Sequence, residues 1–146
     1  MLIVGNGSEI VESTFVGRGR RAAAPQRNDP LLREAAVQVR AYFARRLRCF
    51  DLPLHLRGTE LQVAAWRLVA TLSFGEFVSY ADVAAAIGRP GRHRGVAAAM
   101  SATPLDLFIP AHRVVGADGR VRGAAPNSLR AKLVAFERAQ RSRRSP

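Results

Sequence analysis

Hydrophobic and polar positions recur with different periods along the chain, and each change of period marks a predicted element. Short apolar runs at 2–4 and 10–16 favour two short strands near the N-terminus. From Asp29 onward the apolar positions recur at helical spacing on one face, which predicts a helix over 29–48. Asp29 suits the N-cap of this helix, and Pro30 suits its first position, where no backbone N–H is needed.

Two further helices are predicted in the middle and near the end of the chain. Thr59 and Gln62 have the spacing of a capping box and open a helix that ends near Leu72. The segment 107–109 is interpreted as a buried strand or an apolar turn. A C-terminal helix that carries Glu137 is indicated by apolar residues at helical spacing, namely Leu129, Leu133 and Phe136.

A pair of short helices joined by a tight turn is predicted between these elements. Ser79 suits an N-cap, Tyr80 begins the first helix of the pair, and Gly88 supplies a glycine that ends it. The second helix fits 92–102, with cations in its first turn followed by small side chains. Small side chains let a helix approach another surface closely, and the cations would face a phosphate backbone. The pattern is that of a helix-turn-helix, although alanine-rich helix pairs packed in a core share it.

Composition bounds the class of protein. At 146 residues the chain has the length of one compact domain, and its hydrophobic fraction of 48% supports a packed core and excludes a disordered chain. A single cysteine excludes an internal disulfide framework and a multi-cysteine zinc site, and we expect neither a metal nor a cofactor. The apolar runs are too short to cross a bilayer. These features favour a cytoplasmic location, in association with the nucleoid if the protein is bacterial.

The charge of the chain favours a polyanionic partner. The sequence has 23 Lys+Arg against 11 Asp+Glu, a formal net charge of +12, and Lys132 is its only lysine. The corresponding pI is about 11.7. A surplus of this size in a small protein favours binding to nucleic acid, with a membrane surface as the second choice.

The segment 110–116, Pro-Ala-His-Arg-Val-Val-Gly, carries a family resemblance. Together with matches elsewhere, it resembles the 6-O-methylguanine-DNA methyltransferase family, whose active-site motif is Pro-Cys-His-Arg-Val. The other matches, in order and at family spacing, are Phe50-Asp-Leu-Pro-Leu54, Gly58-Thr59, Gln62, Trp66, Gly75-Glu76, Val78-Ser79-Tyr80, 84–88 and Pro90. The resemblance covers about 30–137.

This resemblance implies a mostly α fold. Its main part is a winged helix-turn-helix-like DNA-binding domain at 54–140. A truncated α/β remnant with one helix is expected before it, at 1–53, and a basic tail after it, at 141–146. We expect a monomer.

One side chain departs from the family motif at the reactive position. Where the family has its nucleophilic cysteine, this chain has Ala111. His112 matches the histidine that removes the thiol proton, and Glu137 matches the glutamate that supports this histidine together with a water, so the relay remains without a thiol to activate. A methyl side chain has no lone pair and cannot accept an alkyl group. Cys49 has no family role at its position, and we interpret it as a partly buried structural thiol.

The resemblance also implies how the chain handles DNA. Tyr80 matches the tyrosine that rotates the target nucleotide out of the stack, and Arg94 matches the arginine that fills the space it leaves. Ala97 and Ala98 lie on the helix that enters the minor groove, and Arg113 is assigned to DNA binding as well.

A lesion pocket is expected next to position 111. The resemblance assigns its lining to Met100, Ala111, Val114 and Val121. Replacement of the thiol by a methyl group leaves space for a larger adduct. Near this pocket the chain has Thr103 in place of the usual asparagine, Asp106 in place of an apolar residue or proline, and a shorter loop at 123–128.

Three functions follow from these features. The first is that of the alkyltransferase-like proteins, which bind 6-O-alkylguanine in double-stranded DNA without repairing it and hand it to another pathway, with nucleotide excision repair proteins as partners. The second is a suicide methylated-DNA-protein-cysteine methyltransferase in which alanine has replaced the cysteine at 111. The third is a general DNA-binding module that has lost lesion recognition.

Overall fold

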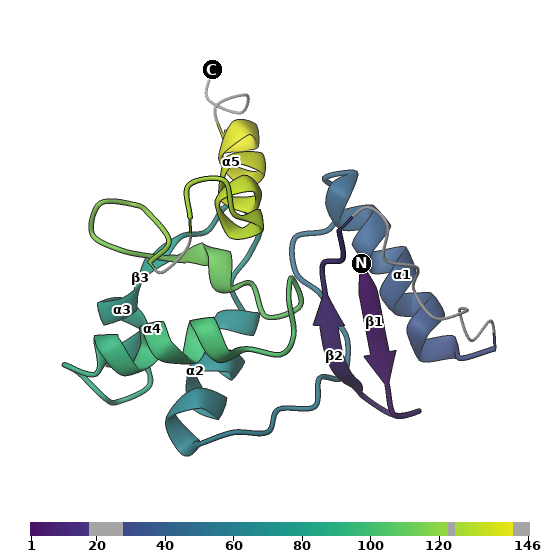
Figure 1. The fold of residues 1–146 in the computed structure, drawn as a ribbon, viewed down its shortest axis with the longest axis horizontal. Coiled ribbons are helices and arrows are strands. Elements are labelled where there is room, and N and C mark those ends of the chain that lie inside the picture. The colour runs from purple at the N-terminus through teal and green to yellow at the C-terminus, as the bar shows by residue number, and fades with distance from the viewer. Residues whose placement is uncertain (18–27, 123–124, 142–146) are drawn as a thin grey trace.

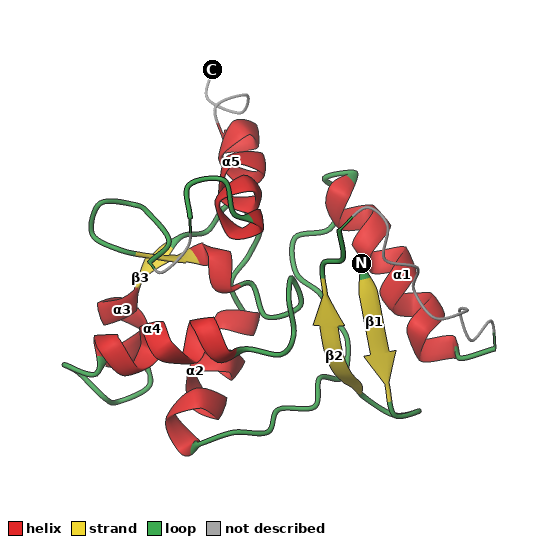
Figure 2. Ribbon diagram, viewed as in Figure 1, coloured by secondary structure: helices red, strands yellow, loops and turns green. Residues whose placement is uncertain are grey.

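A computed structural model describes residues 1–17, 28–122 and 125–141 of the chain. Most of the predicted tail at 141–146 and part of the predicted loop at 123–128 therefore lie outside the described residues. The described elements, mostly helical (Figure 2), are β1 (Leu2–Gly5), β2 (Ile10–Thr14), α1 (Pro30–Phe43), α2 (Glu60–Ala70), β3 (Val78–Ser79), α3 (Tyr80–Ala86), α4 (His93–Ala102), the 3-10 helix η1 (Ala111–Arg113), β4 (Val114–Val115) and α5 (Leu129–Arg141).

The N-terminal part consists of a β-hairpin with helix α1 beside it (Figure 1). Strands β1 and β2 pair antiparallel, which confirms the two predicted strands. Helix α1 begins as predicted, because the carboxylate of Asp29 accepts a hydrogen bond from the backbone N–H of Leu31 at 2.9 Å. The helix ends at Phe43, earlier than the predicted 48, and Arg45 adopts a left-handed backbone conformation with φ of 61°. That conformation is incompatible with a continuing right-handed helix.

Helix α2 begins at the predicted capping box. The hydroxyl of Thr59 accepts from the backbone N–H of Gln62 at 3.2 Å, and the Gln62 side chain accepts from the backbone N–H of Thr59 at 2.9 Å. The indole N–H of Trp66 donates to the carbonyl of Ala99 at 2.9 Å and fixes α2 against α4. Gly58 lies against this corner, since a Cβ there would sit 2.5 Å from the Gln62 Oε1 and 3.0 Å from the Trp66 ring.

Helices α3 and α4 form the predicted helix pair. Ser79 and Asp82 make a second capping box at the start of α3, and Gly88 follows the helix with φ of 74°. Strands β3 and β4, which the sequence pattern does not indicate, pair in parallel and align Val78 with Val114. This pairing fixes the start of α3 next to η1.

The predicted N-terminal region shares its core with the rest of the chain. The backbone N–H of Ile10 donates to the carbonyl of Pro53 at 2.8 Å, and the carbonyl of Ile10 accepts from the backbone N–H of His55 at 2.8 Å. The hydroxyl of Ser13 donates to the carbonyl of Asp106 at 2.7 Å. Strand β2 is therefore bonded to segments on both sides of α2, α3 and α4.

Candidate functional site

A buried carboxylate connects segments that are far apart in the sequence. Glu137 on α5 has an exposed fraction of 0%. Its Oε1 accepts from the hydroxyl of Tyr42 on α1 at 2.8 Å and lies 2.7 Å from Nε2 of His112 on η1. Its Oε2 accepts from the backbone N–H of Gly75 at 2.8 Å, and Nε of Arg113 donates to both oxygens at 3.1 Å. We call these five residues the Glu137 cluster.

The charge states within the Glu137 cluster follow from its burial and its hydrogen bonds. Burial alone would raise the pKa of Glu137, but the hydrogen bonds from His112 and Arg113 outweigh it and lower the pKa from 4.5 to about 2. Burial lowers the pKa of His112 despite the attraction of Glu137. Burial and the adjacent Glu137 charge raise the pKa of Tyr42. At neutral pH, Glu137 is therefore ionised while His112 and Tyr42 are uncharged.

The protonation of His112 determines what its ring can do. A neutral imidazole that donates its Nε2–H to Glu137 keeps Nδ1 as a hydrogen-bond acceptor. This is the arrangement in which a histidine can accept a proton from a neighbouring group. His112 and Glu137, which the resemblance assigns to a relay, are thus in direct contact, and the relay itself stays a prediction.

Arg113 departs from the expected role in DNA binding. Its exposed fraction is 1%, and its guanidinium donates to Glu137 through Nε and Nη2 and to the carbonyl of Leu72 through Nη1. A guanidinium enclosed in this way neutralises a buried carboxylate and is not available to a phosphate or a base. Arg113 is therefore a structural partner of Glu137, and the prediction of a DNA contact is corrected here.

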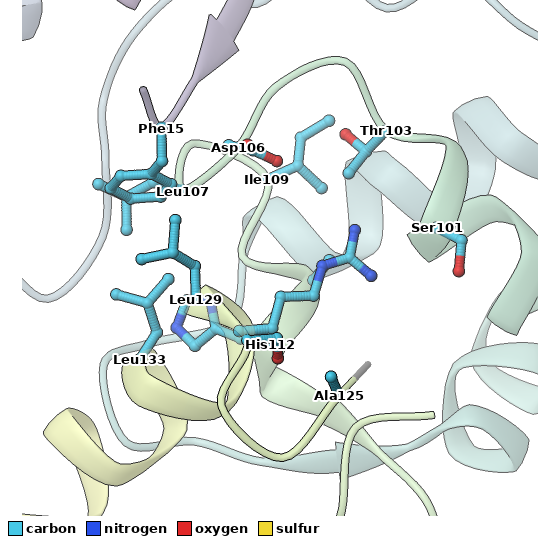
Figure 3. Close-up of a pocket in the computed structure, with 13 residues that line it drawn as sticks. Phe15, Ser101, Thr103, Asp106, Leu107, Ile109, His112, Ala125, Leu129 and Leu133 are labelled. Atoms are coloured by element: carbon cyan, nitrogen blue, oxygen red, sulfur yellow. The ribbon is translucent and has the colours of Figure 1, made fainter. Parts of the chain in front are cut away.

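Ala111 and His112 lie at the wall of a cavity of about 390 Å³ (Figure 3). Apolar side chains that include Leu129 and Leu133 gather at one side of this cavity. The polar residues of its described wall are Ser101, Thr103, Asp106, His112, Ser128 and Arg130. Thr103 and Asp106, which the sequence marks as departures from the family pattern, thus belong to the same cavity as Ala111.

The thiol of Cys49 lies elsewhere. Its Sγ is 3.5 Å from the hydroxyl of Ser73 and 3.8 Å from the carbonyl of Leu72. Cys49 is not among the described residues that line the Ala111 cavity. Because the chain has no other cysteine, this cavity contains no thiol.

The structure brings only part of the expected lesion pocket together. Met100 and Val114 have exposed fractions of 1% and 0% and lie in the core, outside the described wall of the Ala111 cavity. Val121 lines a different hollow, against α5. Of the four residues assigned to the pocket, Ala111 is in the described wall of the cavity, and the carbonyl of Met100 accepts a hydrogen bond from Arg130, which lines the cavity.

Three of the five residues assigned to DNA binding line a second hollow, of about 530 Å³. Tyr80, Arg94 and Ala97 all line it. Tyr80 is buried, and its hydroxyl accepts from the backbone N–H of Arg122 at 2.9 Å. Arg94 is exposed near the start of α4, and Ala98 is exposed on the same helix. The helix pair therefore presents a cation and small side chains beside an anchored tyrosine.

Sequence reasoning missed three residues of these sites. Tyr42 and Gly75 reach Glu137 from positions 95 and 62 residues away, and no local pattern indicates such contacts. Arg130 belongs to an arginine-rich sequence in which composition alone cannot distinguish one arginine from another. Spacing on α5 does indicate that Arg130 lies within one turn of Leu133, which faces the same cavity.

Within 1–17, 28–122 and 125–141, no group of three or more His, Cys, Asp or Glu side chains is arranged to hold a metal ion. In the same part of the chain, no helix has the length and apolar character needed to cross a membrane.

Comparison with known proteins agrees with the resemblance seen in the sequence. Residues 60–139 match the family model of the 6-O-methylguanine DNA methyltransferase DNA-binding domain. A methylated-DNA--protein-cysteine methyltransferase of Methanosarcina barkeri is 35% identical over 128 residues, which cover 86% of this chain and 81% of that protein. The protein of the same name from Mycolicibacterium paratuberculosis is 42% identical over 105 residues, covering 71% of this chain and 64% of that one.

A solved structure supports the same assignment. The crystal structure of Mycobacterium tuberculosis OGT in complex with DNA matches with a TM-score of 0.79 and 32% sequence identity, covering 94% of this chain and 86% of that one. The family model, the relatives and the fold agree, and this chain belongs to the 6-O-methylguanine-DNA methyltransferase family.

Proposed function

We propose that this protein binds 6-O-alkylguanine in double-stranded DNA without transferring the alkyl group, and so marks the lesion for repair by other proteins. The observation that carries the proposal is the position of Ala111. It lies on the wall of a cavity, directly before His112 of the Glu137 cluster, in the motif where the family has its cysteine. The site has the parts that prepare a nucleophile and lacks the nucleophile.

The chemistry of transfer requires an atom that attacks the alkyl carbon. A methyl side chain has no lone pair, so Ala111 cannot form the new bond. The Sγ of Cys49 contacts Ser73 and the Leu72 carbonyl, away from the described cavity wall. His112 therefore has no neighbouring thiol in the described cavity wall that it could deprotonate.

The binding step has support of its own. Tyr80, Arg94 and Ala97 border one hollow, and the formal net charge of +12 favours a phosphate backbone. Rotation of a nucleotide out of the stack costs a few kcal/mol, which an inserted side chain and contacts inside a pocket must offset. Arg94 is suited to insertion because it is exposed near the start of α4.

The test compares two duplexes that differ at one base. Fluorescence anisotropy would measure the dissociation constants for a duplex with a single 6-O-methylguanine and for its guanine twin. We expect the lesion duplex to bind about tenfold tighter or more, and equal affinities would refute lesion recognition in favour of a general DNA-binding module. Arg94→Ala should reduce the ratio. Arg33→Ala, on the exposed face of α1, removes the same charge and should leave the ratio unchanged.

A second measurement addresses transfer. Incubation with the lesion duplex, followed by intact-mass measurement, should show no methyl group gained by the protein. A methylated product would refute the non-catalytic function. The Ala111→Cys variant supplies the missing nucleophile beside His112, and methyl transfer to it would show that the relay is competent.

A further inference from the structure

We propose that Arg130 makes the Ala111 cavity selective for 6-O-alkylguanines whose alkyl group ends in a carboxylate, such as 6-O-carboxymethylguanine. This inference rests on the proposed function, because it requires the cavity to receive the flipped base. It adds the chemical class of the adduct, which neither the family motif nor the relatives specify.

Arg130 places a cation at the wall of this cavity. It lies in the first turn of α5, is half-buried, and lines the cavity together with Ala111 and His112. Its guanidinium donates to the carbonyl of Met100, and none of the ion pairs among the described residues includes Arg130. A guanidinium carries five N–H donors, so most of them remain available to a ligand. A carboxylate is the group that uses such donors best, because it accepts two parallel hydrogen bonds.

The positive charge of Arg130 influences His112, the residue that follows Ala111. The charged groups that shift the pKa of His112 are Glu137, Arg113 and Arg130. Glu137 and Arg113 are buried and neutralise each other, so Arg130 is the cation of this set that faces the cavity. The alkyl group of a bound base is expected next to Ala111. A carboxylate at the end of that alkyl group would therefore extend into the cavity that Arg130 also lines.

The rest of the described cavity wall contains one opposing charge and one supporting dipole. Asp106 also lines the cavity, and strand β2 holds its backbone through Ser13. Its carboxylate would repel an anionic adduct. The N-terminus of α5 borders the same cavity through Ser128 and Leu129, and the positive end of its dipole favours an anion there. His112 is neutral and contributes no charge.

Replacement of the family's cysteine by Ala111 provides space for such an adduct. A methyl group occupies less volume than a thiol, and the cavity measures about 390 Å³ with Ala111 in place. A carboxyl group attached to the methylene of the adduct can extend into it. Binding without transfer does not require the alkyl carbon to lie at reacting distance from position 111. Contacts to the terminal group of the adduct can therefore determine which adduct binds best.

The experiment compares four duplexes identical except for one base: guanine, 6-O-methylguanine, 6-O-carboxymethylguanine and 6-O-carbamoylmethylguanine. The last is the neutral amide of nearly the same shape as the carboxylate. We expect the wild-type protein to bind the carboxylate duplex about fivefold to tenfold tighter than the amide duplex at a fixed salt concentration. Arg130→Gln should bring this ratio close to one.

Matched variants separate the local effect from general charge. Arg33→Gln removes an exposed charge from α1 and should keep the ratio. Asp106→Asn removes the opposing carboxylate and should increase it. Arg130→Lys keeps the charge and should keep part of the ratio, and circular dichroism would confirm that each variant is folded.

The outcomes distinguish carboxylate selectivity from the lesion recognition on which it depends. A wild-type carboxylate-to-amide ratio near one, or a ratio that survives Arg130→Gln, overturns the selectivity even when 6-O-methylguanine is preferred over guanine. The wild-type comparison needs no variant, so a poorly folded variant does not prevent the test. Equal binding of all four duplexes overturns lesion recognition itself.

Discussion

Replacement of Glu137 by glutamine tests whether the Glu137 cluster stabilises the fold. Glutamine has nearly the same shape as glutamate, so Glu137→Gln changes charge and hydrogen bonding with little change in volume. The variant leaves the guanidinium of Arg113 buried, at 1% exposure, without its neutralising carboxylate. It also replaces one acceptor oxygen by an amide NH₂, which cannot accept from the donors around it.

The size of the effect follows from the lowered pKa of Glu137 and from the burial of its ion pair with Arg113. A decrease of the Glu137 pKa from 4.5 to about 2 corresponds to about 3 kcal/mol of stability at neutral pH. Removal of one partner of a buried ion pair costs about 3–5 kcal/mol, because the other charge stays buried and unpaired. We therefore expect Glu137→Gln to lower the free energy of unfolding by about 3–4 kcal/mol.

Urea denaturation at pH 7, followed by circular dichroism, measures this loss. The matched control is Glu12→Gln, which removes an exposed carboxylate from β2. The control should change the free energy of unfolding by less than about 0.5 kcal/mol. A loss below about 1 kcal/mol in Glu137→Gln would contradict a charged, buried Glu137 that neutralises Arg113.

The wild type and Glu137→Gln should differ less in free energy of unfolding at acidic pH. Between pH 4.5 and about 2 the unfolded chain binds a proton at Glu137 and the folded protein does not, so the wild type loses stability as the pH falls. The contribution is complete above the unfolded pKa and disappears below the folded pKa. The stability difference between wild type and Glu137→Gln should thus fall by about half near pH 3. A difference that stays constant down to that pH would refute the lowered pKa.

Three further results are expected. If about five phosphates are neutralised, the logarithm of the binding constant for DNA should fall with the logarithm of salt concentration at a slope of roughly −4 to −5, and a titration series at several salt concentrations measures it. Asp29→Ala removes the N-cap of α1 and should cost about 1 kcal/mol in urea denaturation, because the backbone N–H of Leu31 loses its acceptor. Gly58→Ala should cost about 1–3 kcal/mol, since its Cβ would displace the Gln62 side chain and press on Trp66; an unchanged thermal midpoint would contradict this.

Elements that depend on local interactions could be predicted from the sequence. Asp29 and Thr59 each bond to backbone groups within three residues, so the residue types and their spacing suffice to place the helix starts. The apolar pattern predicts an end of α1 that is too late. Apolar residues continue at helical spacing past Phe43, whereas the backbone turns at Arg45. A left-handed conformation at an arginine has no sequence signal comparable to that of glycine.

Contacts between distant segments could not be predicted. The parallel pair β3–β4 contains two residues per strand, too few for a pattern of alternation. Tertiary packing decides whether an arginine faces solvent or a buried carboxylate. The sequence therefore does not indicate that Arg113 bonds to Glu137. The contact between His112 and Glu137, which are 25 residues apart, is indicated by the resemblance to the family and by no local pattern.

Under the proposed function, the site has lost its nucleophile and kept its architecture, and the Glu137 cluster accounts for the retained architecture. The carboxylate accepts from α1, from the loop after α2 and from η1, and these bonds hold four segments together whatever side chain occupies position 111. Ala111 has an exposed fraction of 4% and bonds through its backbone N–H to the carbonyl of Ile109, which any residue except proline would do. Exchange of cysteine for alanine at this position therefore removes one reactive atom and leaves intact the contacts that shape the cavity, so loss of transfer and retention of binding are compatible in the same fold.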